Sequence, residues 1–481
     1  MDSKSRIAEG LEKLSVFTHS RMGLYPMLGV LGVSAILRYT LAIVNREAND
    51  PHDQVVRIIL RESRLPHAGE TWESFQPKLF HWTMAQGIRL LGLTANDAQT
   101  VFMQIMNTTV GILVLLCVFF FLRRLPIAEP VRFWSLALMA FNPKLIGIDA
   151  QATNDAFVFL FASLAILAAV EFFRTDRFGC FILLIVATIL AGLSKGNGLV
   201  VFVALLGVWI LRMAVGGWRK GRRFIFSSLL FLGVWLSAFF LIVPYFGQYI
   251  QRYRENGSPF VTNLTPDPLP SLFARSETGR PGVVSFSESY LSFPIINLLE
   301  TPMIVSQEDE INPANRTSLW AQIYGRANFA HFDQWPESWQ TDNPIILDIG
   351  RCILVLALLP TLAGALCFLF NIVKNSITLL TKAKFEEEPW VHTLVLGGYI
   401  LFVMLYAWEY RNFNTMKAIF IFPALISMGY FIGNGLQAVY MRVTSRLFRS
   451  IMHLVLGSLV FFYILDISYL ILQLAHDRQW L

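Results

Sequence analysis

Long apolar runs separated by polar stretches dominate the sequence. The runs cover about residues 24–44, 101–122, 133–148, 156–173, 178–193, 199–211, 225–243, 345–373, 391–408, 418–440 and 451–474. A helix needs about 20 apolar residues to cross a hydrocarbon core of about 30 Å, and most of these runs approach or exceed that length. The pattern therefore predicts an all-α polytopic membrane protein, a bundle of about eleven transmembrane helices.

Two longer polar stretches divide these runs. Residues 45–100 form a first outer loop, which we expect to contain short helices lying along the membrane surface. Residues 244–344 lack a spanning run and are rich in Pro, Gly, Ser and Asn, and such a length is too great for a simple connector. We therefore expect an N-terminal segment (1–23), an N-terminal transmembrane module (24–243), a large outer segment (244–344) and C-terminal transmembrane helices (345–481).

Composition and charge support the membrane assignment and set an orientation. The chain is 55% hydrophobic and 15% charged, whereas soluble proteins carry about 25% charged residues. The net charge of +6 is interpreted as a topology signal, not as affinity for nucleic acid. Loops assigned to the cytoplasm, together with the N-terminus, collect most of the cations: Arg123, Arg124, Arg174, Arg177, Arg219, Lys220, Arg222, Arg223, Lys374, Lys382, Lys384, Arg442, Arg446 and Arg449.

This orientation places several polar clusters together on the non-cytoplasmic face. In the first outer loop, Asp50, His52 and Asp53 offer a general base or a metal-binding set. The alternatives are an ordinary hydrated loop and acids that stabilise a helix start after Pro51. The loop closes on further polar groups that are candidates for substrate binding: Glu73, Gln76, Lys78 and His81.

Three other outer turns carry candidate groups. Asn154 and Asp155 precede an apolar run, where capping of a helix is an equal alternative to binding. Lys195 could bind an anionic head group or extend to the membrane interface. Arg411 and Lys417 could meet a phosphate or act as interfacial anchors. Acids that deprotonate a hydroxyl and cations that stabilise a phosphate leaving group are what sugar transfer from a lipid phosphate requires.

Short motifs occur in a fixed order on this face. They read Asn49-Asp50-Pro51-His52-Asp53, Gln76-Pro77-Lys78-Leu79-Phe80-His81, Asn154-Asp155-Ala156, Leu193-Ser194-Lys195-Gly196-Asn197-Gly198-Leu199 and Lys417-Ala418-Ile419-Phe420-Ile421-Phe422-Pro423-Ala424-Leu425. The series resembles the motifs of GT-C-fold glycosyltransferases that use polyprenyl-phosphate sugars, close to bacterial protein O-mannosyltransferases and aminoarabinose transferases. It departs from the family pattern at Lys78, at Phe80-His81 and at Ile419-Phe420.

The resemblance implies roles for the candidate residues. Asp50 would be the general base of an inverting transfer from a polyprenyl-phosphate sugar to a glycan, lipid or protein acceptor, with Asp53 or His52 supporting it. Asp155 would orient the acceptor or a divalent cation, although no metal-ligand spacing assigns a metal. The donor phosphate would be held by cations, for which the candidates are Lys78, Lys195, Arg411 and Lys417.

Two other classes of protein remain as alternatives. A transporter or lipid flippase would place charged residues at mid-membrane depth, and Arg38, Arg351 and Asp466 are the main candidates for such positions. A non-catalytic membrane assembly subunit is the third class, because the motifs depart from the family pattern.

Overall fold

The computed structural model describes residues 3–48, 50–260, 286–302, 318–332, 336–410, 416–443 and 445–480. Within these ranges the regular structure is entirely helical. The N-terminal half contains α1 (Ser3–Asn45), α2 (His52–Glu62), α3 (Leu79–Leu91), α4 (Asn96–Arg124), α5 (Glu129–Ala140), α6 (Pro143–Asp149), α7 (Asp155–Thr175), α8 (Phe178–Ser194), η1 (Gly196–Gly198), α9 (Leu199–Lys220) and α10 (Arg222–Phe246).

The C-terminal half begins with short helices and ends with long ones. Its elements are α11 (Tyr249–Asn256), α12 (Phe286–Leu291), α13 (Ile295–Glu300), α15 (Leu319–Asn328), η2 (Ala330–Phe332), η3 (Glu337–Trp339), α16 (Pro344–Leu356), α17 (Leu358–Lys382), α18 (Glu387–Tyr410), η5 (Ala418–Phe420), η6 (Phe422–Ala424), α19 (Leu425–Arg442) and α20 (Arg446–Asp477).

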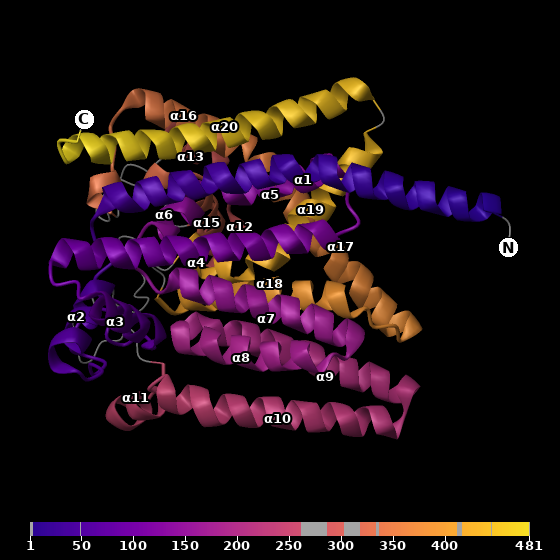
Figure 1. The fold of residues 1–481 in the computed structure, drawn as a ribbon, viewed down its shortest axis with the longest axis horizontal. Helices are drawn as coiled ribbons and strands as arrows, with labels where there is room; N and C mark the ends of the chain where they lie inside the picture. Colours follow the sequence, from indigo (N-terminus) through magenta and orange to yellow (C-terminus); the bar gives the residue numbers. More distant parts are fainter. Residues whose placement is uncertain are drawn as a thin grey trace.

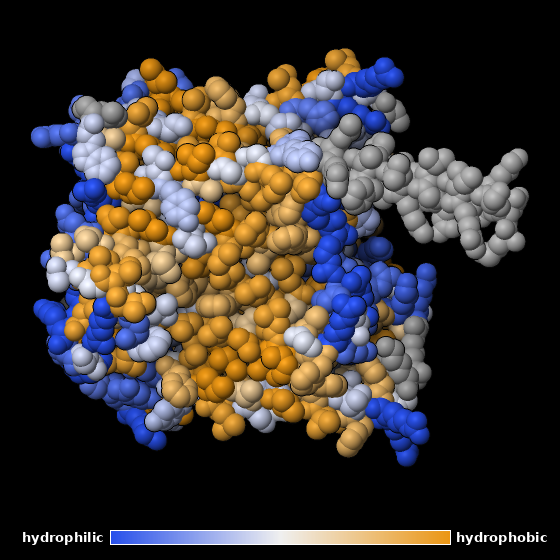
Figure 2. All heavy atoms as spheres, viewed as in Figure 1, coloured by the Kyte–Doolittle hydropathy of each residue, from blue (hydrophilic) through white to orange (hydrophobic). Residues whose placement is uncertain are grey.

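The long helices lie side by side, and α1 projects from one end of the bundle (Figure 1). An apolar band crosses the visible face, with hydrophilic residues toward both ends (Figure 2). Eight described segments are long and apolar enough to cross a membrane: Gly23–Asn45, Asn96–Arg124, Asp155–Thr175, Gly196–Val215, Arg222–Phe246, Pro344–Lys382, Glu387–Trp408 and Arg446–Asp477. The chain is thus a multi-pass membrane protein, while the count of eleven spans stays a prediction.

Besides the run at 345–373, which divides at Ala357 into α16 and α17, two expected spans are not continuous α-helices. The run at 133–148 breaks into α5 and α6, because the Asn142 side chain accepts a hydrogen bond from the Leu145 amide at 3.0 Å and Pro143 occupies the first helical position. The run at 418–440 begins with two 3₁₀ turns, η5 and η6, before α19 starts at Leu425. Both breaks fall where Pro or a capping side chain interrupts an otherwise apolar pattern.

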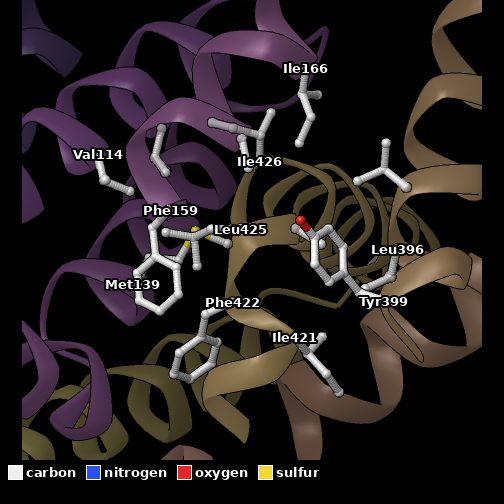
Figure 3. Close-up of a cluster of buried hydrophobic side chains, with 14 of the residues drawn as sticks. Val114, Met139, Phe159, Ile166, Leu396, Tyr399, Ile421, Phe422, Leu425 and Ile426 are labelled. Carbon is white, nitrogen blue, oxygen red and sulfur yellow. The ribbon is translucent and has the colours of Figure 1, made fainter. Parts of the chain in front are cut away.

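Apolar side chains from both halves of the chain meet in the bundle interior. Phe159 of α7 lies beside Met139 of α5 and the ring of Phe422, with Leu425 next to them (Figure 3). The Phe159 and Phe422 rings meet edge to face, with their centroids 6.0 Å apart. This contact joins α7 to η6, the turn before α19, although more than 250 residues separate them in sequence.

The first outer loop forms a small layer at the end of the bundle opposite the projecting part of α1 (Figure 1). The amphipathic helices α2 and α3 bury their apolar faces against each other and against α4 and α7. The shared cluster includes Val55, Val56, Ile59, Phe80, Met84 and Ile88. The expectation of short helices in this loop is confirmed.

Arg38, a charge inside the first span, is fully buried and paired. Its Nε donates to Asp149 Oδ2 at 2.7 Å, and its Nη1 donates to the Ser34 hydroxyl and to the Ala140 carbonyl at 2.6 Å. The pair connects α1 to the ends of α5 and α6. A charge in this position requires such compensation, because burying it unpaired is very unfavourable.

A second buried acid, Asp466 of α20, is satisfied by the large outer segment. Its Oδ1 is 2.7 Å from His331 Nδ1 and its Oδ2 accepts the Ala330 amide at 2.9 Å. Arg351 pairs with Asp348 and donates to the Leu299 carbonyl at 2.8 Å. The charges that could have marked a transport path are therefore engaged in internal contacts.

Replacing Gly111 by alanine tests the buried pair. An added Cβ at Gly111 would lie 2.2 Å from the Asp149 carboxyl carbon, so Gly111→Ala should displace Asp149 from Arg38. We expect a loss of about 3 kcal/mol in stability, seen as a lower melting temperature in detergent. Gly29→Ala on α1 is the control, because nothing lies within 4 Å of its added Cβ. Equal melting temperatures for the two variants would contradict this account.

Candidate functional site

Asp50, His52 and Glu73 converge where α1 gives way to the first outer loop. Asp50 is half-buried, and its carbonyl accepts the His52 amide at 2.7 Å, which fixes the turn into α2. His52 and Glu73 are buried, and His52 Nε2 lies 3.8 Å from Glu73 Oε2. One potential ligand atom from each of the three residues lies within 4.8 Å of the other two. These residues could hold a metal ion.

The His52 ring is fixed from behind by His81 on α3. His52 Nδ1 lies 2.9 Å from His81 Nε2, so one ring donates a hydrogen bond to the other. Burial and, to a smaller extent, the positive charge of Lys195 lower the pKa of His52 to about 3. Burial also lowers the pKa of His81, with the nearby His52 acting in the same direction. Both rings are therefore neutral at pH 7 and can donate or accept hydrogen bonds without carrying a charge.

Asp155 and Lys195 form an ion pair next to the two histidines, in which Asp155 is buried and Lys195 is half-buried. Lys195 Nζ donates to Asp155 Oδ1 at 2.7 Å, and the Thr153 hydroxyl donates to Asp155 Oδ2 at 2.8 Å. The Thr153 oxygen lies 3.4 Å from His52 Nε2, which links this pair to the first outer loop. Asn154 does not cap α7 with its side chain and instead donates to the Ser194 carbonyl at 3.0 Å.

The charges of several groups in this region act on the carboxyl group of Glu73. Burial raises the pKa of its carboxyl well above the ordinary range, and the negative charge of Asp50 raises it further. Lys195 and Lys417 both lower this pKa, and Asp155 raises it. The Lys195 amine also lies 5.8 Å from the ring centre of Phe420, three residues after Lys417. Segments that the sequence assigned to one face thus meet at one end of the bundle.

Lys78 is occupied within its own loop. Its Nζ donates to the Gln76 carbonyl at 2.6 Å and to the Ser74 carbonyl. Burial lowers the pKa of Lys78 to about 7, and the positive charge of Arg252 on α11 contributes in the same direction. Lys78 is therefore placed to shape the loop that carries Glu73.

Other predicted residues have different surroundings. Asp53, in the first turn of α2, is buried and pairs with Arg57 at 2.9 Å, as expected for the helix-start alternative. Burial raises the pKa of Asp53, and Arg57 opposes that change. Gln76 is half-buried beside Lys78. Arg411 lies outside the described residues, as does Asn49 of the first motif.

Polar residues on α4 support the site, and the sequence analysis did not identify them. Asn107 donates to the Thr153 carbonyl at 2.7 Å and the Gln151 carbonyl at 2.8 Å, and Gln104 donates to the Glu47 carbonyl at 2.9 Å. Thr108 donates to the Asp149 carbonyl at 3.0 Å. The available signal was their spacing, since Gln104, Asn107 and Thr108 share one face of an apolar helix.

Comparison with known proteins gives one family match. Residues 89–253, about a third of the chain, match the family model described as dolichyl-phosphate-mannose-protein mannosyltransferase. The match confirms the resemblance over a region that includes Asn154, Asp155 and Lys195. Asp50, Glu73 and Lys417 lie outside it. None of the curated proteins matches the chain.

Several solved structures are similar at low identity. The S. cerevisiae protein O-mannosyltransferase Pmt1-Pmt2 complex bound to the sugar donor has 18% identity and a TM-score of 0.37, covering 51% of this chain and 35% of that one. The Archaeoglobus fulgidus oligosaccharyltransferase has 13% identity and a TM-score of 0.49, and the match covers 92% of this chain and 56% of that one. ArnT from Cupriavidus metallidurans bound to undecaprenyl phosphate has 14% identity and a TM-score of 0.37, and the match covers 85% of this chain and 77% of ArnT. The chain thus spans about a third of the yeast protein and just over half of the archaeal one.

The lowered pKa of Lys78 predicts a pH-dependent stability. Above pH 7 folded Lys78 is neutral, while in the unfolded chain it stays protonated up to its ordinary pKa of 10.5. The unfolded state then binds more protons, so stability should rise with pH by at most about 1.4 kcal/mol per unit. Melting temperatures between pH 7 and 9.5 should therefore climb more steeply for the wild type than for Lys78→Met.

Lys374→Met, which removes an exposed lysine, provides the matched control. Its pH dependence should parallel that of the wild type. If the melting temperature of Lys78→Met also changed with pH as that of the wild type does, Lys78 would titrate as an ordinary exposed lysine.

Proposed function

We propose that this protein transfers a sugar from a polyprenyl-phosphate-linked donor to a glycan, lipid or protein acceptor at the non-cytoplasmic face of the membrane. The observation that carries the proposal is the gathering of acids and lysines around Glu73, from four segments distant in sequence. The mannosyltransferase family match over residues 89–253 supports the same class of reaction and donor.

Asp50 is the proposed general base. It lies half-buried at the end of the first span, beside the buried Glu73 and His52. An acceptor hydroxyl is a poor nucleophile at neutral pH, and a positioned carboxylate that takes its proton accelerates the attack. Asp53 is less suited to this role because Arg57 binds its carboxylate within α2.

The reaction is proposed as a single, inverting displacement. The acceptor oxygen attacks the anomeric carbon as its proton passes to Asp50, and the bond from that carbon to the phosphate oxygen breaks. Polyprenyl phosphate leaves with the bonding electrons, and the new glycosidic bond has inverted configuration. Positive charge near the departing phosphate stabilises this transition state.

Lys195 and Lys417 are the proposed cations for the donor phosphate. An ammonium group has three donors, and the contact with Asp155 uses one of those on Lys195. Asp155 thus fixes the position of Lys195 without using its full bonding capacity. Lys417 acts on the same carboxyl, Glu73, as Lys195 does. Gln76, His81, Asn154 and Lys78 are proposed to shape this pocket, and Arg411 remains a further candidate.

Asp50→Asn tests the base. The change keeps the size of the side chain and removes its basicity, so transfer should fall by about 10²- to 10⁴-fold while donor binding persists. Polyprenyl-phosphate mannose is the first donor to test, because the matched family is named for this sugar. Transfer is measured with the purified protein in detergent, together with melting temperature to confirm folding.

Asp53→Asn is the comparison within the same loop, and it should cost less activity than Asp50→Asn. Strong transfer by Asp50→Asn with none by Asp53→Asn would assign the general base to Asp53 instead. Full transfer by both variants would remove the catalytic role of this loop. A wild-type protein that binds donor but transfers nothing would favour an assembly subunit.

The orientation can be tested by cysteine labelling. In a background without the four native cysteines, Glu62→Cys at the end of α2 should react with an impermeant maleimide added from outside. Arg222→Cys at the start of α10 should react only after the membrane is permeabilised. The opposite pattern would place the site on the cytoplasmic face.

A further inference from the structure

The cluster of Asp50, His52 and Glu73 has the composition of a metal site. It is the one such group in the part of the chain that the structure describes, with one potential ligand atom from each residue within 4.8 Å of the others. The carboxylate oxygens bear lone pairs, and His52 Nε2 bears one in the tautomer that carries its proton on Nδ1. Lone pairs that face one another repel unless a proton or a cation lies between them, and burial strengthens that repulsion.

A second feature, the contact between His52 and His81, points independently to a metal. Metal-ligating histidines generally donate their other ring N–H to a neighbouring acceptor, which fixes the tautomer and the ring orientation. His81 Nε2, 2.9 Å from His52 Nδ1, is placed to be that acceptor. When His52 donates from Nδ1, its Nε2 presents a lone pair toward Glu73. The adjacent Thr153 gives its hydrogen to Asp155, so it cannot donate to that nitrogen.

We propose that Asp50, His52 and Glu73 bind one divalent transition-metal ion, with Mn²⁺ and Zn²⁺ as the candidates. Two carboxylate oxygens and one imidazole nitrogen suit these ions, whereas Mg²⁺ and Ca²⁺ prefer oxygen ligands only. Three protein ligands leave coordination positions open. Lys195 is linked to the cluster through Asp155 and Thr153, whose oxygen lies 3.4 Å from His52 Nε2, so an open position would lie near the proposed phosphate site.

The role assigned to the ion rests on the proposed transfer reaction, but its binding does not. A bound cation would offset the two carboxylates and could coordinate a donor phosphate oxygen. Each carboxylate needs to give only one oxygen to the ion, and the second oxygen of Asp50 remains for the acceptor proton. Metal binding and base catalysis are therefore compatible at this residue.

The test measures metal binding directly on the full-length protein in detergent. Protein stripped with a chelator is equilibrated with Mn²⁺ or Zn²⁺, and bound metal is counted by elemental analysis. We expect one ion per chain, with Mn²⁺ also detected by electron paramagnetic resonance. Glu73→Gln and His52→Gln should each weaken binding at least about 100-fold, and His81→Phe about 10- to 100-fold.

Glu70→Gln is the matched control, because Glu70 is an acid of the same loop that pairs with Arg64 and lies outside the cluster. It should bind metal like the wild type. Only variants that elute as monodisperse protein are compared, and near-isosteric Glu73→Gln keeps the test valid if His52→Gln does not fold. Absence of bound Mn²⁺ and Zn²⁺, or binding that Glu73→Gln leaves unchanged, would overturn the proposal.

The outcomes separate this inference from the proposed function. Metal that binds through these residues in a protein without transfer activity would refute the enzyme function and leave the metal site standing. Transfer by fully stripped protein, together with no binding of Mn²⁺ or Zn²⁺ when either ion is added back, would refute the metal site and leave the enzyme function standing.

Discussion

An arginine inside an apolar helix bundle is tolerated only when its charge is balanced and its N–H groups are bonded. Asp149 balances the charge of Arg38, and the Nε and Nη1 of Arg38 are bonded to Asp149, Ser34 and the Ala140 carbonyl, whereas its Nη2 has no hydrogen-bond partner among the described residues. Because Asp149 is the last residue of α6, this pair fixes the beginning of the segment that leads to Thr153 and Asp155. The geometry of the site thus depends on a contact formed within the bundle.

The same segment is held from the other side by α4. Asn107 binds the carbonyls of Gln151 and Thr153, and these bonds position the Thr153 hydroxyl between His52 and Asp155. Buried polar groups of this kind strongly favour one local structure, because any group left without a hydrogen bond in an apolar environment would cost free energy. Hydrogen bonds to rigid helices therefore fix the positions of the first outer loop and of the segment that carries Thr153 and Asp155.

Hydropathy and charge predicted the helical membrane fold, and motif order indicated the loops that the structure brings together. Short helices were also expected in the first outer loop, and the structure shows that they are amphipathic. The break at Asn142 was not predicted, because a cap and a proline inside an apolar run leave little trace in average hydropathy. Side-chain pairing was not accessible either: His52 with His81 and Lys195 with Asp155 are long-range contacts. Lys78 was one of the candidate phosphate ligands, and sequence alone does not reveal that loop carbonyls bind its amine.

The balance of charges determines what the site would need when the proposed donor binds. Of the groups that act on Glu73, Asp50 and Asp155 are acids like Glu73 itself, and Lys195 and Lys417 are bases, which leaves one net negative charge when all are ionised. A phosphodiester donor would add another. A proton on Glu73 would cancel one of these charges, whereas a divalent cation would cancel both. Because uncompensated charge is least tolerated where water is excluded, donor binding and cation binding at this cluster should favour each other.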